Sequence, residues 1–262
     1  MSNHVAATVL VEHHETISHI RFNRPDVLNA VNSAMARAFL SACQEVAARE
    51  QTRVMVLSGE GRSFMSGMDT RELLDAPETI SRELIEPMNQ AMELLGRLDV
   101  PVLASIQGPI AGAGMSIALA CDLVLAATNC RFNFACLPLD TTCQLGASWH
   151  LPRLVGIHAA LEIALLSESL TVQQALAMGL VNRVVRVEQL PSETQCLAER
   201  LSRAASPAKS QLKRLIRESL TRPLPQQLEE EKQAFTRCLN SREFREAASA
   251  YLEKHPPASG AV

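Results

Sequence analysis

The sequence predicts an α/β protein in which strands and helices alternate through residues 1–190 and helices follow through residues 191–262. Two patterns support this division. Short apolar runs bounded by Gly, Pro, Ser or Asn recur in the first part, and apolar residues return at helical spacing between them. In the second part the helical spacing dominates. Because only 3% of the residues are aromatic, the core must be mainly aliphatic, which suits helices packed closely on a sheet.

Seven short apolar runs are predicted to be strands. The first two flank a polar segment at residues 13–16 and predict a β-hairpin. The run at residues 101–106 is apolar throughout, as expected of an interior strand. The predicted strands cover residues 5–11, 17–22, 54–57, 101–106, 123–126, 130–134 and 181–187.

Helical spacing of apolar residues predicts eight helices. The first has Asn32 or Ser33 as its N-cap. The last is interrupted near Asn240 and Ser241. The predicted helices cover residues 32–49, 80–98, 113–121, 159–166, 172–178, 190–204, 208–220 and 228–251.

Charge and hydropathy argue against several classes of function. The chain has 25 basic and 28 acidic residues, and no basic tract alternates with aromatic residues, so nucleic acid is not an expected partner. No apolar stretch approaches the ~20 residues of a membrane span, and we expect a cytoplasmic protein with no membrane contact. The seven cysteines form no C-x-x-C pair. His13 and His14 would face opposite sides of a strand, so neither a metal nor a cofactor is expected.

Two glycine-containing turns, at residues 62–69 and 107–115, each follow a predicted strand and precede a helix. Small residues at Gly112, Ala113 and Gly114 would let a ligand approach the backbone. The first N–H groups of the following helix lack internal partners and carry the positive end of its dipole. The turns are therefore either ordinary strand–helix connections or donors for a ligand oxygen.

Five segments occur together in order and carry a family resemblance. They are Phe22–Ala30 (FNRPDVLNA), Ser63–Asp69 (SFMSGMD), Gly108–Leu123 (GPIAGAGMSIALACDL), Leu151–Gly156 (LPRLVG) and Ala175–Val181 (ALAMGLV). Over nearly the full chain the sequence resembles the enoyl-CoA hydratase/isomerase (crotonase) family. Residues 132–156 look most like its ring-epoxide phenylacetyl-CoA isomerase branch.

The resemblance implies a spiral of β-β-α units, with a coenzyme A thioester site in residues 1–190 and trimerisation through residues 191–262. It implies a homotrimer or dimer of trimers acting on an acyl-CoA substrate, as an isomerase or lyase of fatty acid metabolism without a further cofactor. The backbone amides of Met68 and Ala113 match the pair that holds the thioester oxygen, an oxyanion hole.

The resemblance also implies a set of substrate-binding positions. Two of them have a second interpretation, because Asp69 also suits a helix cap and Lys254 also suits an exposed helix face. The positions are Asp26, Val27, Leu28, Ser66, Gly67, Asp69, Thr70, Gly112, Gly114, Ser116, Cys136, Gln144 and Lys254.

Three positions where members of this family carry catalytic acids hold Ser116, Cys136 and Gln144. Hydration needs a base and an acid, so the sequence argues against a conventional hydratase. Isomerisation needs only one group that takes and returns a proton. Asp140 is the remaining candidate, either as that proton carrier or as a turn or helix cap. The alternative function is a homologue that binds acyl-CoA without turnover. Trp149 is predicted to lie in the core.

Overall fold

A six-stranded sheet organises the first of the two units into which the chain divides. The structure is a computed structural model, and it describes residues 7–166, 168–203 and 207–254. The first unit is Met1–Arg203 and the second is Ala204–Val262. The sequence-based division lies after residue 190, whereas α9 (Leu190–Ser202) belongs to the first unit because it packs on β2, β3, β4 and β6.

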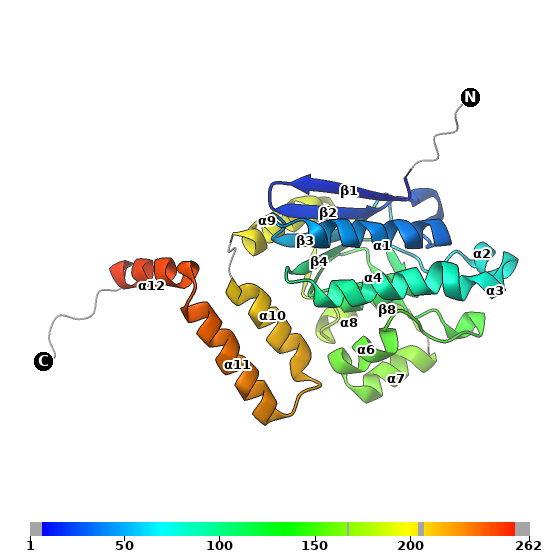
Figure 1. Ribbon diagram of the computed structural model, residues 1–262. Helices are drawn as coiled ribbons and strands as arrows, with labels where there is room; N and C mark the ends of the chain where they lie inside the picture. The colour runs from blue at the N-terminus through cyan, green and yellow to red at the C-terminus, as the bar shows by residue number, and fades with distance from the viewer. Residues whose placement is uncertain (1–6, 167, 204–206, 255–262) are drawn as a thin grey trace, which may run out of the picture. The chain divides into compact units, whose positions relative to one another are not determined.

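The strand order in the large sheet is β1-β2-β3-β4-β6-β9, and Figure 1 shows β1 and β2 at one side of it. The β1–β2 pair is antiparallel and every other neighbouring pair is parallel. The predicted hairpin is confirmed, but its first strand begins later than expected and its turn has only two residues, with Glu15 at φ 51°. The strands are β1 Val9–His14, β2 Ile17–Phe22, β3 Val54–Gly59, β4 Val102–Ile106, β6 Leu123–Ala127 and β9 Arg183–Val185.

A second, three-stranded sheet has the order β5-β7-β8. Its strands are β5 Pro109–Ala111, β7 Arg131–Asn133 and β8 Leu170–Thr171. The sequence predicted only an extended piece around β7. Two- and three-residue strands carry too few positions for an alternating pattern to be recognised.

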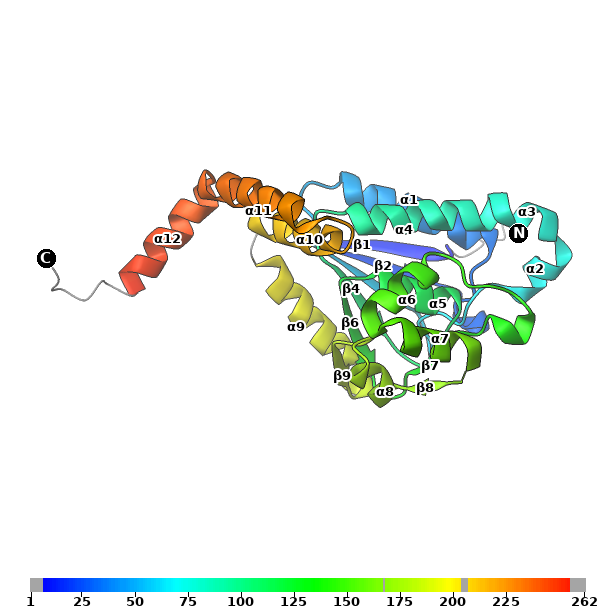
Figure 2. The same ribbon diagram turned by 90° about the horizontal axis from the view of Figure 1, so that it is seen from below.

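Helices cover both faces of the large sheet. Phe22 of β2 packs edge-on against Phe39 of α1, with ring centroids 5.1 Å apart, and α1 packs in turn on α4. On the opposite face, the hydroxyl oxygens of Ser105 in β4 and Thr194 in α9 lie 2.6 Å apart. The buried layer between α1, α4 and the sheet is the main core, and Figure 2 shows both helices along one side of the strands.

The helices of the first unit follow the predicted order, with additions. Asn32 caps α1 by accepting a hydrogen bond from the Met35 amide at 2.9 Å. The predicted helix at 80–98 is divided into a π-helical turn, Ser81–Ile85, and α4. The helices are α1 Ser33–Ala48, α2 Thr70–Asp75, α3 Pro77–Ile80, α4 Glu86–Arg97, α5 Ala113–Ala120, α6 Ala147–Val155, α7 Ile157–Leu166 and α8 Val172–Ala177, with 3-10 turns η1 Pro25–Val27, η3 Leu137–Leu139 and η4 Val187–Gln189.

Trp149 is a correction to the sequence analysis, because 42% of it is exposed rather than buried. The residues that α6 buries are Ala147 and Leu151. Trp149 lies midway between them in sequence and therefore points to the other side of the helix. The Arg153 guanidinium carbon lies 4.0 Å from the centre of its ring, a cation–π contact at the surface.

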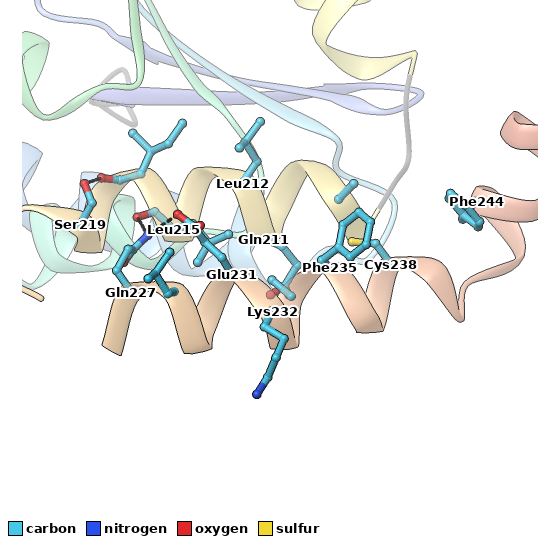
Figure 3. Close-up of a pocket in the computed structure, with 14 residues that line it drawn as sticks. Gln211, Leu212, Leu215, Ser219, Gln227, Glu231, Lys232, Phe235, Cys238 and Phe244 are labelled. Carbon is cyan, nitrogen blue, oxygen red and sulfur yellow. Dashed lines mark hydrogen bonds between the residues drawn. The ribbon is translucent and has the colours of Figure 1, made fainter. Parts of the chain in front are cut away.

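The described part of the second unit, residues 207–254, contains three helices: α10 Pro207–Ser219, α11 Leu224–Leu239 and α12 Arg242–Lys254. The predicted break near Asn240 and Ser241 separates α11 from α12. A groove of about 840 Å³ lies along α10 and α11 and reaches Phe244 of α12. Figure 3 shows that its apolar lining includes Leu212, Leu215 and Phe235.

Candidate active site

The two glycine turns lie against each other. They follow β3 and β4, which are parallel neighbours, so both leave the sheet at the same edge. A bridge pairs Met65 with Ile110, and the Ala111 amide donates to the Met65 carbonyl at 3.1 Å. The structure therefore brings together the two segments whose amides the family resemblance pairs.

Glycine is required in this contact for two different reasons. At Gly112 the φ angle is +46°, a conformation that side-chain-bearing residues rarely adopt. At Gly114 an added Cβ would lie 2.2 Å from the Met65 carbonyl oxygen. The turns also meet at Gly67, since a Cβ on Gly112 would lie 3.6 Å from the Gly67 Cα.

The backbone N–H of Met68 points away from its neighbouring chain segment. Met68 forms a parallel bridge with Val31, in which Val31 donates to the Gly67 carbonyl and Asp69 donates to the Val31 carbonyl, at 2.9 and 2.8 Å. The alternation of an extended chain turns the intervening Met68 amide to the other side. Within the described ranges this amide has no hydrogen-bond acceptor.

The Ala113 amide is unpaired for another reason. Ala113 is the first residue of α5, and the first N–H groups of a helix have no internal acceptor. No other group in the described part of the chain accepts a hydrogen bond from the Ala113 amide. Ala113 is fully buried. Because unpaired buried backbone donors are rare in proteins, the two turns offer donors suited to a ligand oxygen.

Segment 24–31 is held beside the first turn by side chains that the sequence analysis had not assigned. Asn29 is fully buried and its Nδ2 donates to the carbonyls of Glu60 and Ser63 at 2.9 and 2.8 Å. Its Oδ1 accepts from the Arg24 amide at 2.7 Å. Asn is one of the residues that tolerate a positive φ, here 57°, and bond to nearby backbone in turns. Its burial, which indicates that it holds the two segments together, could not be predicted from one sequence.

The expected CoA-contacting segments run side by side. The Ser66 amide donates to the Leu28 carbonyl at 3.0 Å, which places Asp26–Leu28 next to Ser66–Thr70. Asp26 and Val27 are exposed in η1 and Thr70 is exposed at the start of α2. Their contact with a substrate stays a prediction.

Asp69 has the structural role that its sequence context suggested. Its carboxylate accepts a hydrogen bond from the Arg71 amide at 3.2 Å and so caps α2. It also pairs with Arg24 Nη2 at 3.0 Å. The carboxylate is therefore already engaged in fixing the end of the first turn.

Two of the positions that lack the family's acids lie beside the glycine turns. Ser116 is buried in α5, and its hydroxyl lies 3.2 Å from the Gly112 carbonyl and 3.0 Å from the Gln144 carbonyl. Gln144 in turn donates from Nε2 to the Met68 sulfur at 3.7 Å. A chain of contacts thus joins the second turn, the loop before α6 and the first turn.

Cys136 is a protonated thiol rather than a base. It is buried, and its sulfur donates to the Phe134 carbonyl at 3.3 Å. Burial raises the pKa of Cys136, and the nearby Cys143 thiol raises it further. Only a thiolate accepts a proton or attacks as a nucleophile, so Cys136 does not replace the missing acid chemistry.

Asp140 is exposed at the end of the 3-10 turn η3, and Lys254 is exposed at the end of α12. Asp140 follows η3 with φ 49°, and its amide donates to the Leu137 carbonyl at 2.9 Å. Its carboxylate accepts no hydrogen bond from residues 7–166, 168–203 or 207–254. Lys254 is the last residue of α12, in the second unit. Their roles toward a substrate stay predictions.

The described residues contain no cluster of three or more His, Cys, Asp or Glu that could hold a metal ion. Among the helices that the structure describes, none has the length and hydropathy needed to cross a membrane.

The sequence matches the family model described as enoyl-CoA hydratase/isomerase over residues 12–260. The chain belongs to the enoyl-CoA hydratase/isomerase family. It is 36% identical over 254 residues to a probable enoyl-CoA hydratase of Rhodobacter capsulatus, covering 95% of this chain and 96% of that protein. It is 32% identical over 243 residues to a 1,2-epoxyphenylacetyl-CoA isomerase of Escherichia coli, covering 91% and 92%.

Solved structures of this family share the fold. The enoyl-CoA hydratase of Bacillus anthracis matches with a TM-score of 0.90 at 27% identity, over 94% of this chain and 96% of that one. An enoyl-CoA hydratase/isomerase structure from Mycobacterium abscessus matches with a TM-score of 0.89 at 30% identity, over 94% and 96%. The family and the α/β crotonase fold expected from the sequence are confirmed.

Proposed function

We propose that this hydratase/isomerase family member binds an acyl-CoA thioester and stabilises its enolate with the backbone amides of Met68 and Ala113. The observation that carries the proposal is that both amides lack an acceptor in the described structure, at the place where two glycine turns meet. An enolate places negative charge on the thioester oxygen. Removing one such donor typically costs ~3–4 kcal/mol of transition-state stabilisation.

We propose an isomerase-type reaction, in which one group removes a proton and returns it at another carbon. Hydration would require both an acid and a base with suitable pKa values. Ser116 and Gln144 offer neither at neutral pH, and burial keeps the Cys136 thiol protonated. Asp140 is the proposed proton carrier, and its exposed position after η3 requires that the loop bring its carboxylate to the substrate.

The alternative function is a family member that binds acyl-CoA without turnover. It is favoured by the absence of a carboxylate at Ser116, Cys136 and Gln144 and by the exposure of Asp140. In this case the protein would act through binding, in the same site and with the same two amides.

Deuterium exchange in heavy water separates the two functions. The full chain is incubated with saturated and unsaturated short-chain acyl-CoAs, and deuterium in the acyl group is followed by mass spectrometry. Incorporation that disappears in Asp140→Asn supports the isomerase; binding without incorporation across the panel supports the alternative. If no acyl-CoA binds by calorimetry, the proposed function is wrong.

Ala113→Pro tests the amide itself. Proline is tolerated at the first position of a helix, where the N–H has no internal partner, so this variant removes the donor without removing a hydrogen bond of α5. We expect exchange to fall by about 10²–10³-fold while the far-UV circular dichroism spectrum is kept. Exchange at the wild-type rate would contradict the role of this amide.

We also propose a cytoplasmic homotrimer or dimer of trimers. Support comes from the second unit, where apolar side chains of α10 and α11 such as Ile216, Leu228 and Phe235 are more than half exposed. Size-exclusion chromatography with light scattering tests the assembly, and a monomeric mass would contradict it.

A further inference from the structure

A pocket of about 320 Å³ lies on the face of the large sheet that carries α9, and the proposed function does not use it. Its lining residues all belong to the first unit, and none is a position that the family resemblance assigned to the substrate. Ligand pockets in proteins usually have volumes of about 300–1,000 Å³. This pocket is therefore large enough for a small molecule.

The floor of the pocket is polar because of the register of β2 and β3. Phe22 of β2 packs against α1, so the alternation of the strand turns Arg21 and His19 to the opposite face. The parallel register places Arg21 beside Ser58 and His19 beside Val56, and all four of these residues line the pocket. The sheet thus brings a guanidinium, an imidazole and a hydroxyl to one place.

Gln107 has an acceptor oxygen that faces no donor in the described part of the chain. Its Nε2 donates to the carbonyls of Gly59 and Gly61, at 2.7 and 3.0 Å. A carboxamide has two N–H donors and one acceptor oxygen, so both donors are used and the orientation of the group is fixed. The Oε1 atom remains as an unused acceptor.

Two more acceptors lie beside Gln107. Glu60 is held between the two glycines that Gln107 binds, and Ser58 directly precedes them. Glu60 Oε1 pairs with Arg21 Nη1 at 3.0 Å, whereas Glu60 Oε2 and the Ser58 hydroxyl have no hydrogen-bond partner among residues 7–166, 168–203 and 207–254. Three oxygen atoms that can accept hydrogen bonds therefore converge on the pocket.

The charges around the pocket favour a cation over an anion. Arg21 is the one guanidinium among the lining residues, and it is shared by two carboxylates, those of Glu12 and Glu60. Burial lowers the pKa of His19, so its imidazole adds no positive charge at neutral pH. One negative charge is thus left in excess, and it would repel an anionic ligand.

We propose that this pocket binds a small molecule with a primary ammonium group, which donates to Gln107 Oε1, Glu60 Oε2 and the Ser58 hydroxyl. An ammonium group has three N–H donors and no acceptor, which matches three unused acceptors and a net negative charge. The apolar stem of the ligand lies against Val56 and Leu190, which also line the pocket. The site does not depend on the proposed acyl-CoA chemistry.

The test compares three ligands of equal length that differ in their terminal group. n-Butylammonium, 1-butanol and butyrate are titrated into the full chain at neutral pH, and dissociation constants are measured by saturation-transfer NMR. We expect butylammonium to bind about 5- to 10-fold more tightly than 1-butanol. A fully buried charged hydrogen bond would give a larger ratio, but Glu60 is partly exposed to water. Butyrate should show no saturable binding.

Two variants identify the pocket as the place of binding. Glu60→Gln removes the excess negative charge while Arg21 keeps Glu12 as its partner, so the ratio of butylammonium to butanol affinity should fall to about one. Gln195 lines the pocket and is exposed on α9. Gln195→Trp fills the pocket without changing the sheet and should abolish saturable binding of butylammonium.

Glu50→Gln is the matched control, because Glu50 is an exposed glutamate outside the pocket. It removes the same charge from the protein and should leave all three affinities unchanged. Absence of saturable butylammonium binding to the wild type overturns the inference, as does tighter binding of butyrate. Butylammonium binding that persists unchanged in both Glu60→Gln and Gln195→Trp shows adventitious association with the acidic surface only, and also overturns it.

Discussion

Gly114→Ala should destabilise the protein because Gly114 packs directly on the backbone of the first turn. An added Cβ would lie 2.2 Å from the Met65 carbonyl oxygen and 2.9 Å from both the Met65 carbonyl carbon and its Cβ. Met65 is fully buried, and its carbonyl accepts the Ala111 amide at 3.1 Å. The contact cannot be relieved by rotating an exposed side chain, so one of the two turns must move.

The expected cost follows from three terms. Overpacking a rigid core costs about 1–3 kcal/mol, and a contact with backbone at this distance belongs near the upper limit. Weakening the hydrogen bond between Ala111 and Met65 costs about 1 kcal/mol, whereas replacing glycine by alanine in a helix returns about 1 kcal/mol. The free energy of unfolding should therefore fall by about 3 kcal/mol.

Urea unfolding followed by circular dichroism measures this loss. The matched control is Gly96→Ala in α4, where an added Cβ meets no atom within 4 Å; it should be neutral or stabilising by up to about 1 kcal/mol. Gly114→Ala should also lower acyl-CoA affinity, because the displaced turn carries the Ala113 amide. An unfolding free energy for Gly114→Ala equal to that of Gly96→Ala would refute the reasoning.

Three further predictions concern the supports of the site and the buried thiols. Asn29→Ala removes the hydrogen bonds that hold residues 24–31 to the first turn and should lower the free energy of unfolding by about 2–4 kcal/mol; a loss below about 0.5 kcal/mol in urea unfolding would contradict this. Asp69→Asn keeps an N-cap acceptor for α2 but loses the charge beside Arg24, so it should cost less than Asp69→Ala, and its cost should shrink in 1 M salt, as thermal unfolding at two salt concentrations can check. Burial raises the pKa of the Cys130 thiol from 9.0 to about 12, so its stabilising contribution is complete below about pH 9 and is lost as pH rises from there toward 12. Over that range the free energy of unfolding should fall by up to about 1.4 kcal/mol per pH unit because of this thiol. Urea unfolding of Cys130→Ala across the same pH range should show a shallower fall.

The local pattern of the chain was sufficient to predict many elements. The helix after Asn32, the buried α5 and the break between α11 and α12 each depend on neighbours a few residues away, through capping, apolar spacing and interruption of that spacing. Two short strands, β5 and β8, were missed because their pairing depends on distant segments.

Side-chain burial was less readable than secondary structure. Trp149 is large and apolar and was expected in the core, but the face of α6 that meets the rest of the protein is defined by Ala147 and Leu151. Asn29 is the opposite example: it is a polar residue in a turn, yet it is fully buried, and its side chain donates to two backbone carbonyls.

The sequence by itself determined the family, the order of most strands and helices, and the absence of acidic side chains at Ser116, Cys136 and Gln144. These properties depend on residue identity and on local spacing. Only the tertiary structure decided that the two glycine turns touch, that the Met68 and Ala113 amides are both left without acceptors, and that Gln144 lies against Met68. Those relations depend on β3 and β4 being parallel neighbours, which joins segments more than forty residues apart at one edge of the sheet.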